Sequence, residues 1–141
     1  MMNGKSFNRI LLIGLFNGLL LGFITKWIEA SSGIKVYQLL LNVDFIPIFG
    51  EIPWNEAWLF SFHLFISIFL TYGYAYMIQK RKIVKRFAFA NLFIIPAILL
   101  YFPLAFLSKT MVIPSFDLFT FLLWALAHFI YSLFLPLSIQ K

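Results

Sequence analysis

The sequence contains two histidines, His63 and His128, and each lies inside a long apolar stretch. Each histidine shares a helical face with polar residues that recur three or four positions apart. The stripe of His63 also holds Ser67, Thr71 and Tyr74, and the stripe of His128 also holds Thr120, Trp124 and Ser132. Imidazoles in a membrane can relay protons, line a path or bind haem iron, but they also form plain hydrogen bonds between helices. We favour the hydrogen-bonding role, because the sequence places no acid or base near mid-membrane.

Bis-histidine ligation of haem works best with two histidines at similar depths on different helices. His63 is expected about 7 Å outward of the middle of its span, at a rise of 1.5 Å per residue, whereas His128 lies near the middle of its own. The sequence has no Gly-rich phosphate loop, no HExxH, no GxSxG and no Cys, which excludes thiolate sites. We therefore expect a protein that is not an enzyme and has no catalytic residues, no metal and no cofactor.

The composition indicates the kind of scaffold that must position these side chains. Of 141 residues, 62% are hydrophobic and 11% are charged, and the mean hydropathy is +0.94. Soluble domains have about a quarter of their residues charged, and disordered chains are poor in aromatics, so both classes are excluded. The net charge of +6 does not indicate nucleic acid here, because the charges flank apolar spans. The chain is expected to be an integral membrane protein whose surroundings are the lipid bilayer.

Charge-free intervals predict four membrane-spanning helices. The expected spans are 10–27, 57–79, 87–108 and 118–139, joined by a basic loop at 80–86 and a longer loop at 28–56. The first span is expected to stay in the protein rather than be cleaved as a signal peptide, because Lys26, Trp27 and Glu29 stand where small residues would be needed. Pro96 and Pro103 should bend the third span. The predicted fold class is all-α, an integral membrane four-helix bundle that forms one domain over residues 1–141.

The distribution of charge predicts the orientation. The loop at 80–86 and the two terminal segments carry eight basic residues and no acid, whereas the opposite side carries three lysines and all five acids. Because loops on the cytoplasmic side are enriched in Lys and Arg, both termini are expected in the cytoplasm. We expect a multi-pass protein of the plasma membrane.

The outer loop at 28–56 is unusually apolar. Val36, Leu39, Leu40 and Val43 recur at helical spacing, and Pro47 and Gly50 then break the pattern. This pattern predicts a short helix and an extended segment that lie in the membrane interface, with apolar side chains among the headgroups. The segment is either a cap on the bundle or a lid and docking surface, and we favour the cap.

Three glycines in the first span predict close helix packing. Gly14, Gly18 and Gly22 are four apart, so they lie on one helix face where another backbone can approach. Asn17 lies beside this face and can donate a hydrogen bond across it. The packing partner is a helix of the same chain or of a second copy, and we favour the same chain.

Residues 36–47, which read VYQLLLNVDFIP, are similar to the outer-loop signature of a family of small, uncharacterised four-span membrane proteins of Bacillus-type Firmicutes. Phe62-His63-Leu64, followed by Ser67, resembles the start of the second span in that family. The resemblance implies the four-span topology and no specific activity. It also implies special roles for four residues, which are Asn42, Asp44, Pro47 and His63. Asp44 and His63 should both lie near the outer face, where a carboxylate–imidazole contact would hold the loop on the bundle.

These observations predict a small bacterial membrane protein of accessory or structural type. The alternative is an oligomeric transporter or channel subunit whose polar path includes His63, Ser67, Thr71 and His128. A haem- or quinone-binding protein is a third possibility. The expected partners are the lipid bilayer and either a second copy of the chain or another membrane protein, and no nucleic acid is expected.

Overall fold

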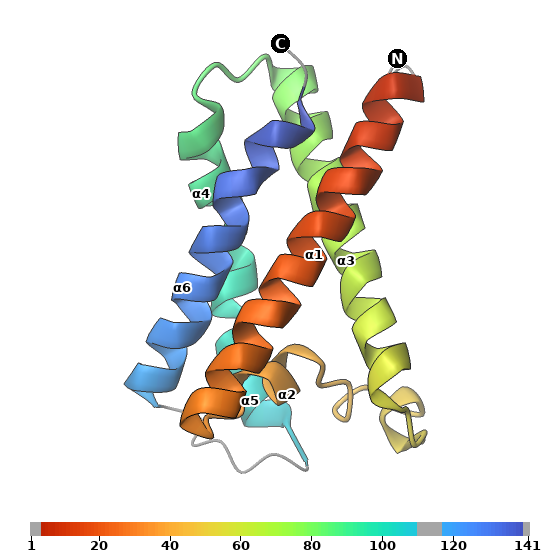
Figure 1. The fold of residues 1–141 in the computed structure, drawn as a ribbon, viewed down its shortest axis with the longest axis vertical. Helices are drawn as coiled ribbons and strands as arrows, with labels where there is room; N and C mark the ends of the chain where they lie inside the picture. Colours follow the sequence, from red (N-terminus) through yellow and green to blue (C-terminus); the bar gives the residue numbers. More distant parts are fainter. Residues whose placement is uncertain (1–3, 110–116, 140–141) are drawn as a thin grey trace.

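The protein is all-helical in the computed structural model, which describes residues 4–109 and 117–139. The longer helices are α1 (Gly4–Ser32), α3 (Glu56–Arg81), α4 (Arg86–Leu99) and α6 (Leu118–Phe134). The shorter ones are α2 (Val36–Leu40), η1 (Phe49–Glu51), α5 (Tyr101–Leu107) and η2 (Leu135–Ser138). Four stretches are long and apolar enough to cross a membrane, namely Ser6–Ser32, Glu56–Arg81, Arg86–Leu107 and Leu118–Ser138. The predicted all-α four-helix membrane bundle is confirmed (Figure 1).

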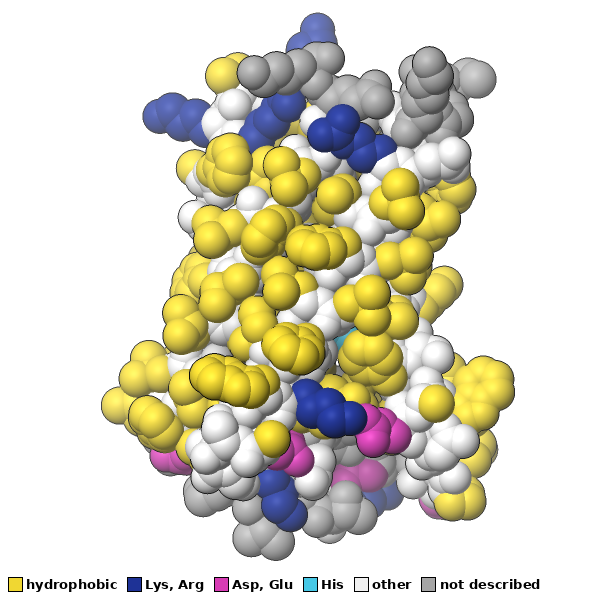
Figure 2. Space-filling model, viewed as in Figure 1, with side chains coloured by type: hydrophobic (Ala, Val, Ile, Leu, Met, Phe, Trp, Pro, Cys, Tyr) yellow, Lys and Arg dark blue, Asp and Glu magenta, His cyan; other side chains and the backbone are white. Residues whose placement is uncertain are grey.

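The two ends of the bundle differ in their connections and their charge. The start of α1, the turn between α3 and α4, and η2 lie at one end, whereas α2 and η1 lie at the other (Figure 1). Figure 2 shows an apolar band between the ends, with Lys and Arg but no visible acidic side chain at the first end, and both acidic and basic side chains at the second. We refer to the end with α2 and η1 as the outer end. The molecule is a multi-pass membrane protein.

The helix boundaries follow local backbone chemistry rather than the edges of the apolar stretches. Helix α1 continues past the predicted span to Ser32 and ends at Gly33, which has a φ of 74° and donates its N–H to the Glu29 carbonyl. Glycine adopts this left-handed conformation without steric cost. The third span is interrupted after Leu99, because Pro103 has no N–H to donate to the Leu99 carbonyl.

The outer loop differs in one respect from the expected interfacial helix. Helix α2 packs against α1, α5 and α6, and its Val36 and Leu39 are 0% exposed. Their apolar side chains are therefore covered by protein and not by headgroups. Beyond α2, Ile48 and Ile52 are exposed, as an interfacial segment would require.

The glycine face of α1 packs against α3. A Cβ at Gly14 would lie 2.7 Å from the Ile68 Cα, and one at Gly18 would lie 2.8 Å from a methyl group of Leu64. A Cβ at Gly22 would overlap the Phe60 ring. The three glycines therefore serve packing within the chain, as favoured from the sequence, and this face is already occupied by α3.

Gly14→Ala should destabilise the bundle by about 1–3 kcal/mol, because its Cβ would meet the backbone of α3. The unfolding free energy in detergent micelles, followed by circular dichroism, measures this effect. Gly73→Ala is the matched control, since its Cβ would lie 3.7 Å from the nearest Phe93 atom, an ordinary contact. Equal stability of the two variants would contradict the close approach of α1 and α3.

Candidate functional site

The polar stripe of α3 forms hydrogen bonds with the backbone of α1. His63 Nε2 lies 3.1 Å from the Gly18 carbonyl oxygen, and Ser67 Oγ donates to the Gly14 carbonyl at 2.7 Å. A carbonyl oxygen only accepts, so the His63 proton is on Nε2. The two donors are four residues apart on α3, and their acceptors are four residues apart on α1. The two antiparallel helices are therefore in register over this contact.

Tyr131 extends this contact to α6. Its hydroxyl lies 3.0 Å from Ser67 Oγ and donates to the Ser67 carbonyl oxygen at 3.2 Å. Its own carbonyl accepts from Asn17 Nδ2 at 3.4 Å. Thr71 Oγ1 donates back to the Ser67 carbonyl of its own helix at 2.9 Å. Asn17, Ser67 and Tyr131 thus join α1, α3 and α6 in the interior, although the sequence analysis did not single out Tyr131.

Asn17 also has an unsatisfied atom. The residue is 0% exposed, and its Oδ1 has no hydrogen-bond partner within residues 4–109 and 117–139. An unpaired buried amide oxygen has lost its hydrogen bonds to water, and this cost reduces the net contribution of the side chain to stability. Asn17 therefore contributes to the interior mainly through its bond to the Tyr131 carbonyl.

The second histidine has a different role from the first. His128 Nδ1 lies 2.8 Å from the Trp124 carbonyl of its own helix, and the His128 and Trp124 rings are 4.4 Å apart. Ser132 Oγ donates to Asn91 Oδ1 at 2.7 Å and so connects α6 to α4. Both predicted stripes face the interior, but the two histidines take part in separate hydrogen bonds.

At the outer end, one carboxylate of α1 holds the start of α2. Glu29 Oε2 accepts from the backbone N–H groups of Tyr37 and Gln38, both at 3.0 Å. Glu29 Oε1 accepts from Gln38 Nε2 at 2.9 Å. The carboxylate satisfies backbone donors that have no partner within α2. This contact positions the cap, which we define as residues 33–55.

A second carboxylate joins three helices. Glu56 Oε1, at the start of α3, accepts from Lys26 Nζ of α1 at 2.5 Å and from the Tyr37 hydroxyl of α2 at 3.0 Å. Burial raises the pKa of Tyr37 to about 12, and the hydrogen bond to Glu56 and the negative charges of Glu56 and Glu29 act in the same direction. The Tyr37 hydroxyl therefore keeps its proton and continues to donate to Glu56 across the neutral pH range.

Asp44 connects the cap to the end of α5. Its Oδ2 accepts from the Lys109 N–H at 3.0 Å and lies 3.4 Å from Ser108 Oγ, while its own N–H donates to Asn42 Oδ1 at 2.9 Å. The predicted contact between Asp44 and His63 is wrong, because among the described residues His63 bonds to Gly18. Asp44 does hold the loop on the bundle, but through α5.

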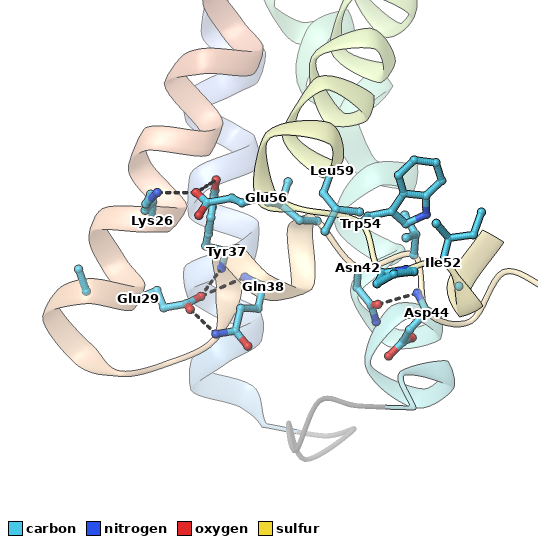
Figure 3. Close-up of a pocket in the computed structure, with 15 residues that line it drawn as sticks. Lys26, Glu29, Tyr37, Gln38, Asn42, Asp44, Ile52, Trp54, Glu56 and Leu59 are labelled. Atoms are coloured by element: carbon cyan, nitrogen blue, oxygen red, sulfur yellow. Dashed lines mark hydrogen bonds and ion pairs between the residues drawn. The ribbon is translucent and has the colours of Figure 1, made fainter.

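These side chains surround an open cleft of about 770 Å³ at the outer end. Figure 3 shows Lys26, Glu29, Tyr37 and Gln38 on one side of it, and Asn42, Asp44, Ile52 and Trp54 on the other. A second hollow of about 510 Å³ lies between α1 and α3, and it shares Lys26, Tyr37 and Glu56 with the cleft. Within the described ranges, no group of three or more metal-binding side chains is present.

Of the cleft residues, only Asn42 and Asp44 were predicted from the sequence. Lys26, Glu29, Tyr37 and Glu56 were not grouped, although the concentration of acids in an apolar outer loop was a usable signal. The chain matches no protein-family model, no curated protein and no solved structure. The resemblance to a four-span family of Firmicutes stays a prediction.

Ser67→Ala and Tyr131→Phe should each destabilise the bundle by about 0.5–1.5 kcal/mol, because each removes buried hydrogen bonds between α3 and α6. In a double-mutant cycle of unfolding free energies, their combined effect should be smaller than the sum. Ser61→Ala is the control, since Ser61 is exposed on the same helix and its hydroxyl donates to the Ala57 carbonyl of that helix. Strict additivity would argue against the Ser67–Tyr131 contact.

Proposed function

We propose that the protein is a non-enzymatic accessory protein of the plasma membrane, with both termini in the cytoplasm. Its four-helix bundle holds a capped binding cleft at the extracytoplasmic end. The observation that carries this proposal is that polar residues within the spans and charged residues at the outer end have different surroundings. Polar residues within the spans, such as His63 and Ser67, bond helix to helix, whereas four charged residues of the outer end line an open cleft, namely Lys26, Glu29, Asp44 and Glu56.

The orientation is supported by the basic turn between α3 and α4. Residues 80–86 contain five basic residues and no acid, and they lie at the same end as the start of α1 (Figure 1). Short loops rich in Lys and Arg remain in the cytoplasm. The end that carries Glu29, Asp44 and Glu56 then faces outward.

The anchored cap supports a binding role. Glu29 fixes α2, Glu56 fixes Tyr37, and Asp44 fixes the loop after α2. A cleft whose walls are already held in place binds with little loss of conformational entropy. Its position at the outer end makes it accessible to a partner that approaches from outside or from the outer leaflet.

A transporter path or a haem site has less support. His63 donates to a backbone carbonyl of α1, and His128 donates to one of its own helix. Both contacts fix the rings as parts of the packing between or along helices. The polar stripes therefore favour a structural role over conduction.

The orientation can be measured directly, because the chain has no natural cysteine. In intact cells, a membrane-impermeant maleimide should label Ser32→Cys, at the outer end of α1. It should label Val84→Cys, which replaces a residue that is 89% exposed in the basic turn, only after the membrane is permeabilised. The reverse pattern would overturn the proposed orientation.

The binding role is tested by photo-crosslinking in native membranes. We expect p-benzoyl-phenylalanine in place of Ile52, which lines the cleft and is 42% exposed, to give a discrete adduct. The matched control places the same group at Leu122, an exposed residue of α6 outside the cleft. If both positions gave only the same diffuse lipid labelling, the cleft would not be a binding site.

A further inference from the structure

The outer cleft adjoins a hollow in the side of the bundle. The hollow between α1 and α3 is lined by apolar groups of Leu19, Gly22, Phe23, Ala57 and Phe60, and it meets the cleft at Lys26, Tyr37 and Glu56. From Leu19 to Lys26 it extends for about 10 Å along α1, at 1.5 Å per residue. This stretch belongs to the spans Ser6–Ser32 and Glu56–Arg81. The apolar hollow and the polar cleft are therefore neighbours that share one wall, which consists of the bonded side chains of Lys26, Tyr37 and Glu56.

The cleft, which is the polar one of these two openings, is acidic. Glu29, Asp44 and Glu56 line the cleft, and Lys26 is the one basic residue among the described residues that line it. Lys26 is paired with Glu56, whereas Glu29 is held by neutral backbone and amide donors. The negative charge of Glu29 is therefore not neutralised by its own contacts. Tyr37 and Trp54 also line the cleft, and aromatic rings attract cations.

An apolar surface, a basic residue and then acidic residues follow one another from the hollow to the cleft. One class of ligand carries complementary groups in the same order. An amphiphile from the bilayer would place an acyl chain in the apolar hollow, and its headgroup would enter the cleft past Lys26. A phosphate at that level is adjacent to the Lys26 ammonium, and a terminal ammonium reaches the carboxylates beyond it. A soluble cation would leave the hollow unfilled, and an anionic headgroup would be repelled by the carboxylates of the cleft.

We propose that the cleft and the hollow between α1 and α3 together bind an outer-leaflet phospholipid with an amine headgroup. Its acyl chain lies against Gly22 and Phe60, and its ammonium lies in the cleft, whose two sides carry Glu29 and Asp44. This inference rests on the proposed binding function and names its ligand class.

Native mass spectrometry of the full chain tests the proposal, with phosphatidylethanolamine and phosphatidylglycerol of identical acyl chains as probes. The wild type should bind the ethanolamine lipid in preference to the glycerol lipid. The double variant Glu29→Gln/Asp44→Asn should reduce that preference by at least about threefold. The matched control Glu51→Gln/Asp117→Asn removes two outer charges that do not line the cleft, and it should keep the preference. Equal binding of both lipids by the wild type would overturn the proposal.

The acyl-chain site has its own test. Ala57→Trp should fill the hollow and reduce the binding of both lipids, whereas Ala88→Trp, at an exposed position of α4, should leave it unchanged. Equal binding by these two variants would overturn the placement of the chain.

Crosslinking at position 52 separates the two proposals. A discrete protein adduct there, together with no lipid preference, would overturn the lipid inference and leave the proposed binding function standing. Absence of any discrete adduct would remove both.

Discussion

The close approach of α1 and α3 is the constraint on which the rest of the structure depends. Lipid gives helices little hydrophobic reason to associate, so they are held by packing and by interhelical hydrogen bonds. Glycines at positions 14, 18 and 22 remove the side chains that would separate the backbones. Two carbonyls of this face then come within reach of His63 and Ser67. The same feature thus supplies both contact area and hydrogen bonds.

The other contacts extend from this pair of helices. Ser67 connects to Tyr131 on α6, and Ser132 of α6 connects to Asn91 on α4. At the end opposite the outer end, Arg9 Nε donates to the Leu137 carbonyl at 2.6 Å and joins α1 to η2. At the outer end, Lys26, on the same helix, is fixed to Glu56 of α3. All four spans are therefore linked by polar contacts, with α4 joined to α1 and α3 through α6.

The sequence predicted the parts of the structure that depend on local pattern. Charge-free intervals identified the four spans, and the glycine spacing identified the packing face of α1. The break at Leu99 lies between the two prolines that were expected to bend that helix. The partner of His63 could not be predicted, because every residue has a backbone carbonyl and the sequence does not show which carbonyl lies within reach of the imidazole. The burial of α2 was also missed, since an apolar face looks the same whether protein or headgroups cover it. The cleft depends on residues far apart in the sequence, such as Lys26 and Glu56, which are 30 positions apart. It forms only when the cap is folded.

The polar interior of α3 has a consequence for how the chain enters the bilayer. Of the four spans, α3 is the least apolar, since it carries His63, Ser67 and Thr71 toward the middle of the membrane. Each polar group of this kind makes the transfer of the segment from the translocon into lipid less favourable. Helix α1 is synthesised first and already offers the Gly14 and Gly18 carbonyls that α3 needs. The hydrogen bonds that satisfy His63 and Ser67 of the second span are therefore available only where the first span is already in place.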